Sequence, residues 1–245
     1  MSKKEINVLG IIPARGGSKG IPYKNIASLA GKPLIYYTIK SAQGSKRLDT
    51  FIVTTDNKKI ASVAKSLGAD VPFIRPKKIS GDDATDIQFL SHAIEWLEEN
   101  RGWRPEITVL LRPTSPFRTS EDIDKVIDFM IKEKCDSVRT LSLPSPYNPY
   151  KMWNVSNERN YKIKPLLTTK YFETMGTDVP RQLLPKIYWQ NGMVEATKTK
   201  FIKNNRVYGP DIRGLITNPN KVIDIDSPLD LLIAETILKH ARKTK

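Results

Sequence analysis

Short apolar runs alternate with amphipathic helical patterns along this chain, and this alternation constrains the fold more than any other feature. Runs typical of buried strands are "INVLGIIP" at 6–13, "FIVTTD" at 51–56, "ITVLL" at 107–111 and "DSVRTLSL" at 136–143. Helical patterns follow them at 33–43, 57–69, 87–97 and 119–130. Strands that are separated by helices usually pair in parallel, and the helices cover both faces of the sheet. The pattern therefore predicts an α/β fold with a mostly parallel, twisted sheet flanked by helices.

Particular residues predict where several of these elements begin. Asp56 can cap the helix at 57–69, and Thr119 with Asp122 forms a capping-box pattern before the next helical stretch. "KVIDIDSPLDLLIAETILKH" at 221–240 predicts a final strand and helix, with Ser227 and Asp230 at the helix start.

The alternation is interrupted between 144 and 185, where Pro, Tyr and Asn are frequent. A hairpin-like pattern, "MWNVSNERNYKIK", lies in the middle of this stretch at 152–164. We therefore expect a core domain made of 1–143 and 186–245, with 144–185 as a β-rich insertion that forms a small subdomain or a dimer arm.

Charge and composition limit the partners. The 245 residues include 40 Lys and Arg against 26 Asp and Glu, a formal net charge of +14 that favours polyanions such as nucleic acid, anionic membrane or nucleotide. A continuous apolar run of roughly 18 residues is absent, so we expect no transmembrane helix. "MSKKEINVLG" at the start does not read as a signal peptide, and Cys135 is the single cysteine. These features favour a cytoplasmic location and a packing role for Cys135.

The loop after the first strand, "IIPARGGSKGIPYKN" at 11–25, has the composition of an anion-binding loop. Ligands of open α/β sheets bind beyond the carboxyl ends of the strands. Its glycines let backbone N–H groups approach an anion, while its cations supply charge; these residues are Arg15, Gly16, Gly17, Lys19, Gly20 and Lys24. The spacing matches neither the Walker P-loop nor the dinucleotide G-x-G-x-x-G pattern. The loop therefore suits a triphosphate, with a flexible basic turn as the alternative.

Two aspartates two residues apart, Asp224 and Asp226, suit a divalent cation. Residues i and i+2 of a strand point to the same face, roughly 7 Å apart, and Mg²⁺ usually binds one or two carboxylates together with substrate phosphates. The alternative is that this acidic stretch only starts the last helix.

Covalent catalysis and zinc chemistry find no support in the sequence. His92 and His240 are isolated, Cys135 has no cationic cluster nearby in sequence, and zinc-ligand spacings are absent. Phosphate-binding cations beside paired carboxylates instead favour phosphoryl or nucleotidyl transfer, in which positioning and charge neutralisation carry most of the catalysis.

Several blocks taken together resemble the acylneuraminate cytidylyltransferases, the enzymes that make CMP-sialic acid and related CMP-activated sugars. The blocks are "IIPARGGSKGIPYKN", "FIVTTD", "IRP…S" at 74–80, "LLRPTSPFRT", "PRQLLP…NG" and "IDIDSPLDL", in the family's order over about residues 8–235. The resemblance implies a nucleotidyltransferase fold, a Rossmann-like three-layer arrangement, with 144–185 serving in dimerisation.

The resemblance also implies roles for individual residues on the nucleotide side. Arg15 and Lys24 would hold the phosphates of CTP, the co-substrate, with Gly16, Gly17 and Lys19 shaping the loop. Asn25, Arg75 and Ser80 would contact the base and ribose. Mg²⁺ would bind Asp224 and Asp226, and the residues expected to act in catalysis are Arg15, Lys24 and Asp226.

On the sugar side, the family usually has Gln where this chain has Arg112, a cation that could pair with a substrate carboxylate. The other residues implied to contact the sugar are Thr114, Ser115, Arg181, Gln182, Asn191 and Lys151, the last donated across a homodimer.

The predicted reaction is transfer of CMP from CTP to the anomeric hydroxyl of a nonulosonic acid, such as sialic, legionaminic or pseudaminic acid, with release of pyrophosphate. No side chain is an obvious general base. The alternatives are another sugar acid such as 3-deoxy-octulosonic acid, another nucleoside triphosphate, a nucleic-acid-binding protein, and an NAD-dependent oxidoreductase. The last two are disfavoured because nucleic-acid-binding motifs and the dinucleotide pattern are missing.

Overall fold

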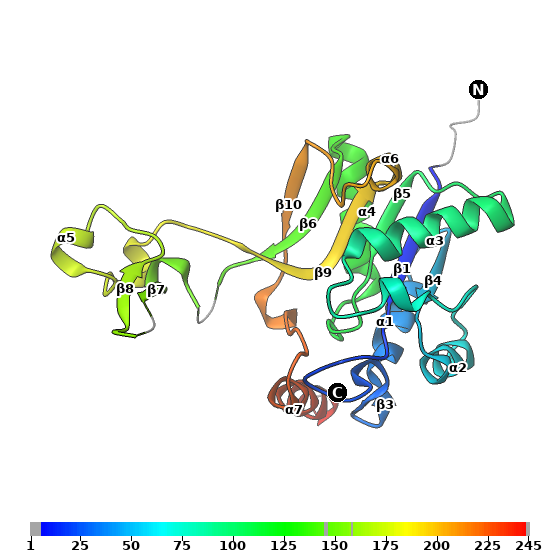
Figure 1. Cartoon of the computed structure of the whole chain (residues 1–245), viewed down its shortest axis with the longest axis horizontal. Coiled ribbons are helices and arrows are strands. Elements are labelled where there is room, and N and C mark those ends of the chain that lie inside the picture. Colours follow the sequence, from blue (N-terminus) through cyan, green and yellow to red (C-terminus); the bar gives the residue numbers. More distant parts are fainter. Residues whose placement is uncertain (1–5, 145–146, 158, 244–245) are drawn as a thin grey trace. The chain divides into compact units, whose positions relative to one another are not determined.

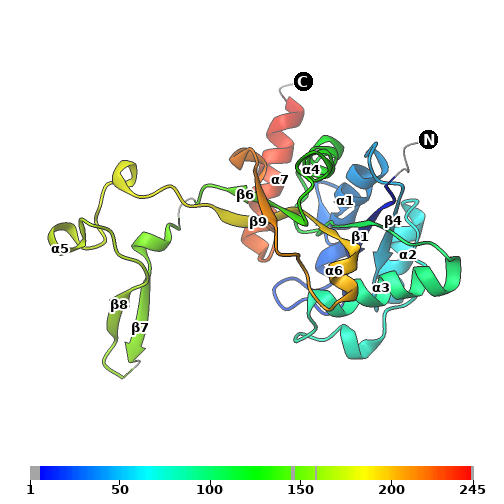
Figure 2. The ribbon, with the colours of Figure 1, turned by 90° about the horizontal axis from the view of Figure 1, so that it is seen from above.

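The computed structural model describes residues 6–144, 147–157 and 159–243, which divide into two compact units (Figures 1 and 2). The larger unit extends up to Thr140 and resumes at Asn191, and the smaller unit is Leu141–Gln190. The expected insertion at 144–185 lies within the smaller unit.

A sheet organises the larger unit. Within the described residues its six strands are ordered β10 (Ile212–Ile216), β6 (Ser137–Ser142), β9 (Trp189–Lys198), β5 (Ile107–Leu110), β1 (Val8–Pro13) and β4 (Thr50–Thr54). β1 pairs in parallel with both β4 and β5, whereas β5 pairs antiparallel with β9. The predicted α/β class with a mostly parallel sheet is confirmed.

Alternating apolar residues along the central strands face two different helical layers, because successive strand side chains point to opposite faces. Val8 and Ile12 of β1 pack in a cluster with α1 (Leu34–Gln43), α2 (Lys58–Ser66) and α4 (Ser120–Glu133). Leu9 and Ile11 pack in a second cluster with α3 (Asp86–Arg101) and α6 (Thr199–Lys203). Figure 2 shows α1 and α4 on one side of the sheet and α3 and α6 on the other.

The predicted helix starts are partly right. Thr119 and Asp122 form the expected capping box at α4. At α7 (Pro228–Lys243), Asp230 N–H donates to Ser227 Oγ at 3.3 Å and Ser227 N–H donates to Asp230 Oδ2 at 2.7 Å. The prediction for Asp56 is wrong, because Asn57 caps α2 by accepting from the next turn.

The strand predicted at the start of 221–240 is also wrong. A 3₁₀ turn, η5 (Pro219–Lys221), leads into irregular extended chain at 222–226. Ile225 holds this segment by burying its side chain beside Leu34 and by donating from its N–H to Thr114 O at 2.9 Å. The missed edge strand β10 has mostly exposed side chains, so it lacks the apolar run by which a strand is recognised.

Short elements complete the larger unit. A 3₁₀ turn, η1 (Lys24–Ile26), and a small antiparallel pair, β2 (Ser28–Leu29) and β3 (Lys32–Pro33), follow β1, and η2 (Lys77–Ile79) precedes α3. None of the helices in the described residues has the length and hydrophobicity needed to span a bilayer. Cys135 is fully buried in the first apolar cluster, as its predicted packing role requires.

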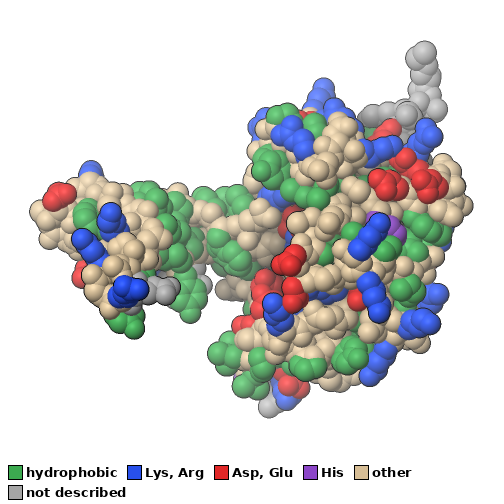
Figure 3. All heavy atoms as spheres, in the orientation of Figure 1, with side chains coloured by type: hydrophobic (Ala, Val, Ile, Leu, Met, Phe, Trp, Pro, Cys, Tyr) green, Lys and Arg blue, Asp and Glu red, His purple; other side chains and the backbone are tan. Residues whose placement is uncertain are grey.

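The smaller unit has its own elements and a different surface. Its antiparallel strands β7 (Trp153–Asn157) and β8 (Lys162–Pro165) form the hairpin expected at 152–164. Its other elements are η3 (Pro149–Lys151), α5 (Phe172–Met175) and η4 (Arg181–Leu183). Large apolar side chains are exposed here, Tyr147 at 76% and Tyr161 at 77%, and Figure 3 shows such side chains at the surface of this unit. Its role in dimerisation stays a prediction.

Candidate active site

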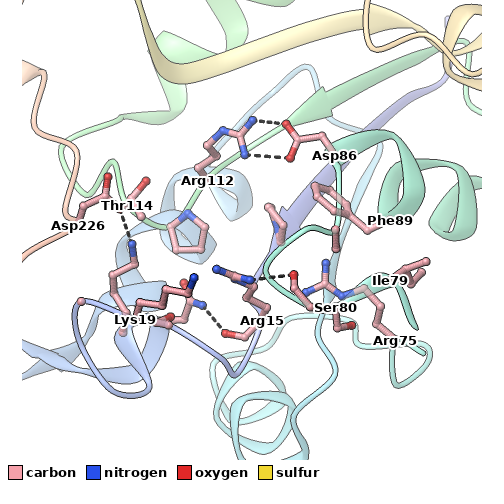
Figure 4. Close-up of a pocket in the computed structure, with 18 residues that line it drawn as sticks. Arg15, Lys19, Arg75, Ile79, Ser80, Asp86, Phe89, Arg112, Thr114 and Asp226 are labelled. Carbon is pink, nitrogen blue, oxygen red and sulfur yellow. Dashed lines mark hydrogen bonds and ion pairs between the residues drawn. The ribbon is translucent and has the colours of Figure 1, made fainter. Parts of the chain in front are cut away.

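A cavity of about 430 Å³ opens beyond the carboxyl ends of β1 and β5, where ligands of open α/β sheets bind (Figure 4). Most of the residues predicted to bind nucleotide line it together with part of the predicted sugar and metal set: Arg15, Lys19, Lys24, Asn25, Arg75, Ser80, Arg112, Thr114 and Asp226. Figure 3 shows acidic and basic side chains interspersed around a hollow on this face of the larger unit.

Gly16 and Gly20 of the loop after β1 are required by close contacts rather than by positive φ angles. A Cβ on Gly20 would lie 2.3 Å from the backbone oxygen of Asp226, so only glycine lets the loop touch the 222–226 segment. A Cβ on Gly16 would lie 2.9 Å from Asn57 Nδ2, whereas Gly17 has open space. Gly16 N–H donates to Asp56 Oδ1 at 2.8 Å, which explains why Asp56 is not free to cap α2.

Three cations of this loop are paired with carboxylates of the same chain. Asp82 accepts from Arg15 Nη1 at 2.9 Å and lies 3.0 Å from Lys19 Nζ, and Lys24 Nζ donates to Asp226 Oδ1 at 2.6 Å. Lys19 and then Arg15 hold the pKa of Asp82 below its usual value. We call these three contacts the exposed ion pairs; in each of them at least one partner is well exposed to solvent.

Arg75 differs from these cations because it is buried and forms no ion pair within the described residues. It is 4% exposed, its guanidinium lies 5.3 Å from the centre of the Phe89 ring, and its Nε and Nη2 have no hydrogen-bond partner among the described residues. Desolvation lowers the pKa of Arg75, and the charge of Asp56 opposes this shift. Buried donors without acceptors are costly, so this side chain indicates that a ligand supplies the acceptors.

Ser80 and Asn25 are held in place beside Arg75. Ser80 Oγ donates to Pro76 O at 3.0 Å, and Asn25 Nδ2 donates to Arg15 O at 3.0 Å. Both side chains are buried, which fixes their positions on the cavity wall.

Arg112 lies on the opposite wall, facing Asp86 (Figure 4). Its Nη1 donates to Asp86 Oδ1 at 3.3 Å, its Nη2 donates to Asp86 Oδ2, and its Nε donates to Glu195 Oε1 at 3.4 Å. Glu195 also pairs with Arg139 at 3.5 Å, and we call these four residues the ion network. Burial would lower the pKa of Arg112, but hydrogen bonds and charges from Asp86 and Glu195 outweigh it and raise that pKa. The guanidinium of Arg112, which the sequence suggested could pair with a substrate carboxylate, therefore already faces two carboxylates of its own chain.

Asp224 and Asp226 are brought together by an irregular segment and not by a strand. The Asp226 side chain is 71% exposed and reaches the cavity, whereas Asp224 does not line it. Desolvation raises the pKa of Asp224 and the negative charge of Asp226 adds to this, although a hydrogen bond from Thr114 opposes it. Like charges that disfavour each other's ionisation are relieved by a cation, and a pair suits Mg²⁺ because phosphates supply further ligands. Groups of three or more His, Cys, Asp or Glu suited to a metal are absent from the described residues.

The remaining predicted sugar-side residues lie elsewhere. Asn191 is buried in the sheet, where its Oδ1 accepts from Thr140 Oγ1 at 2.7 Å. Ser115 is buried and does not line the cavity. The others belong to the smaller unit, and their part in the site stays a prediction: Lys151, Arg181 and Gln182.

Several residues of the site were not anticipated from the sequence. Asp82 and Asp86 come from the acidic stretch "GDDATD" directly after Ser80, a placement that could have marked them. Arg118 is buried and donates to Met193 O and Thr38 Oγ1, both at 2.6 Å, and to Arg112 O at 3.1 Å. Burial lowers its pKa to about 9. Arg118 therefore ties the loop after β5 to its neighbours, and its position within "PTSPFRT" gave no such signal.

Known proteins resemble this chain in sequence and in fold. Residues 9–164 match the family model described as cytidylyltransferase. The CMP-N,N'-diacetyllegionaminic acid synthase of Legionella pneumophila is 33% identical over 236 residues, which cover 96% of this chain and 97% of that protein. The N-acylneuraminate cytidylyltransferase of Escherichia coli is 29% identical over 97% of this chain, but the match spans only 54% of that longer protein.

Solved structures show the same fold. The structure of CMP:2-keto-3-deoxy-manno-octonic acid synthetase complexed with CTP matches 96% of this chain and 99% of its own, with a TM-score of 0.70 at 15% sequence identity. At this identity the likeness shows the fold alone, and it supports the sheet with its flanking helices.

Proposed function

Since the chain belongs to the cytidylyltransferase family, we propose that it transfers CMP from CTP to the anomeric hydroxyl of a nonulosonic acid such as sialic, legionaminic or pseudaminic acid. The named relatives act on acids of this class, which supports the choice of acceptor.

The observation that carries the nucleotide half of this proposal is Arg75. Its buried guanidinium has two nitrogens without acceptors in a cavity that also holds the cations of the glycine loop. A nucleotide would satisfy both features of the cavity. Its base or ribose offers hydrogen-bond acceptors to Arg75, and its triphosphate offers negative charge to the loop cations. Asn25 and Ser80, fixed on the same wall, would contact the nucleoside.

In the reaction, the anomeric hydroxyl of the sugar would lose its proton to a bound water and its oxygen would form a bond to the α-phosphorus of CTP. The bond from that phosphorus to the β-phosphate oxygen would break, and pyrophosphate would leave. Arg15 and Lys24 would hold the phosphates and neutralise the charge that grows on the leaving group. Because both cations are paired with carboxylates in the free protein, they would have to exchange those partners for phosphate oxygens.

Asp224 and Asp226 would hold Mg²⁺ together with the phosphates. When bound, this cation would neutralise phosphate charge and could lower the pKa of the attacking hydroxyl. Asp226 would then give up its contact with Lys24, and that ammonium group would turn to the phosphates.

The sugar would lie toward Arg112 and Thr114, with Asp86 close by. Because Arg112 is already engaged by Asp86 and Glu195, it would hydrogen-bond the sugar with its remaining N–H and would not act as a free cation. Arg181 and Gln182 would complete this side, Lys151 would come from the partner of a homodimer, and the buried Asn191 would act only by holding the neighbouring strands in place. The exposed apolar side chains of the smaller unit support such a dimer. A cytoplasmic location is consistent with a lone, buried, unpaired Cys135.

Pyrophosphate release from CTP and Mg²⁺ tests the proposal, with sialic, legionaminic, pseudaminic and 3-deoxy-octulosonic acids offered one at a time. Release that depends on one nine-carbon acid supports the proposal and names the substrate. Release only with 3-deoxy-octulosonic acid, the eight-carbon acid, would mean that the substrate is an eight-carbon sugar acid and not a nonulosonic acid. Absence of release with all four acids would overturn it.

A further inference from the structure

Asp82 occupies an unusual position among the carboxylates of the cavity region. One of its oxygens accepts from Arg15 and the other lies against Lys19, so a single carboxylate bridges two cations of the glycine loop. Arg15 Nη1 also donates to the backbone oxygen of Gly81, the preceding residue, at 2.8 Å. The turn that contains Gly81 and Asp82 thus lies against the groups expected to receive the triphosphate.

Apart from these contacts, little holds the turn that contains Gly81 and Asp82 in place. It connects η2 to α3, and residues 81–83 are all exposed. A Cβ at Gly81 would meet nothing within 4 Å, so the turn is not packed on that side. Within the described part of the chain, the side chain of Asp82 contacts Arg15 and Lys19. Exposed ion pairs of this kind contribute little to stability, so the turn can separate from the loop at low cost.

We propose that Asp82 is an exchangeable counterion that occupies the triphosphate-binding cations of the free protein and lowers its affinity for CTP, an inference that rests on the proposed function. A triphosphate carries several negative charges where Asp82 carries one, so the phosphates win the competition. Before they bind, however, Arg15 and Lys19 must lose their contacts with Asp82. Asp82 thus keeps the glycine loop ordered in the absence of nucleotide. The free energy needed to break its contacts lowers the affinity of the protein for CTP.

Asp82 differs in this respect from Asp226, the carboxylate that pairs with Lys24. Asp226 lines the cavity and is expected to bind the metal, so its removal should stop the reaction. Asp82 does not line the cavity, and its removal should leave the bound state intact.

The test compares Asp82→Asn with Asp83→Asn. The two residues are neighbours, both are exposed, and each change removes one negative charge, but no contact of Asp83 with Arg15 or Lys19 is found in the described structure. Binding of CTP and of inorganic tripolyphosphate is measured by titration calorimetry at low salt without sugar. We expect Asp82→Asn to bind both probes roughly three- to tenfold more tightly than the natural protein, and Asp83→Asn to change binding by less than about twofold.

Each outcome decides something. Unchanged or weaker binding by Asp82→Asn would overturn the proposal, as would equal tightening by Asp83→Asn, which would mean that only the general field matters. If the natural protein binds tripolyphosphate but not CTP, the proposed function fails while the tripolyphosphate series still tests Asp82. Binding of neither probe by any of the three proteins would overturn both ideas. Melting temperatures measured alongside should agree closely, because an exposed turn is altered.

Discussion

Arginine lies beside carboxylate on both walls of the cavity, but the two walls hold these charges differently. In the exposed ion pairs, Arg15, Lys19 and Lys24 each have a single carboxylate partner. In the ion network, Glu195 is shared between Arg112 and Arg139, and its side chain is only 9% exposed. Exposed pairs exchange partners readily, whereas a network whose shared carboxylate is buried, as Glu195 is here, resists exchange.

The difference separates two ways of recognising an anionic substrate. The wall with the exposed ion pairs can give its cations to phosphates, so it is suited to charge neutralisation. The wall with the ion network is already neutral within itself, since two arginines face two carboxylates. It is therefore suited to recognition by shape and directed hydrogen bonds, and the sugar carboxylate should find its partner elsewhere.

The largest expected effect is on catalysis, from Asp226→Asn. This change keeps the shape of the side chain but removes the charge that would bind Mg²⁺ and that pairs with Lys24. We expect turnover to fall by about a thousandfold or more, with the fold retained because the side chain is mostly exposed. Steady-state rates and circular dichroism measure the two properties. Near-normal rates would rule out the metal assignment.

Next in size is the effect of Glu195→Gln on stability. The substitution leaves Arg112 and Arg139 close together without the shared negative charge, and removing one partner of a buried pair costs about 3 kcal/mol in free energy of unfolding. Urea denaturation should show this loss, while Asp82→Asn should leave the same free energy almost unchanged because its ion pairs are exposed. Equal, small shifts in both variants would mean that the two walls do not differ as described.

The third largest effect is expected from Arg75→Met, and it concerns nucleotide binding. Met keeps apolar contact with Phe89 but has no donors for the base or ribose. We expect the KM for CTP to rise about 30-fold, near 2 kcal/mol, and the KM for the sugar to change little. The free protein should become slightly more stable, because a buried guanidinium without acceptors is removed. Loss of stability instead would indicate that Arg75 has a structural role.

A feature of the fold or the site could be predicted from the sequence when residues close together in the chain determine it. The strands at β1, β4 and β5 and the start of α4 follow from apolar runs and from the Thr119 capping box, which are visible in short windows. The glycine loop was likewise recognisable from its own residues. By contrast, the pairing of Arg112 with Asp86 joins residues 26 positions apart, and that of Lys24 with Asp226 joins residues 202 apart. A sequence shows that these charges exist but does not show which of them meet.

The same limit explains the wrong prediction at 222–226. Alternation of apolar and acidic residues in "VIDID" is typical of a strand, but a strand also needs a neighbour with free backbone groups. Here Ile225 N–H donates to the carbonyl of Thr114 in a loop, and the backbone at Asp226 lies against Gly20 instead of beside another strand. Asp226 reaches the cavity all the same, because the buried Ile225 side chain anchors the segment between the two aspartates.

The smallest expected effect is the response of the two walls to salt. Raising ionic strength from about 0.05 to 0.3 M shortens the Debye length and screens exposed charges more than desolvated ones. The KM for CTP, set by the cations of the exposed ion pairs, should rise several-fold over this range. The KM for the sugar, which meets an internally neutral ion network, should change by less than about twofold. The ionic strength should be raised with a potassium salt of a weakly binding anion, because chloride or sulfate would compete with the phosphates of CTP for the cations. A sugar KM that rises as steeply as the CTP KM would show that the sugar wall also works through free charge, and the contrast between the walls would be lost.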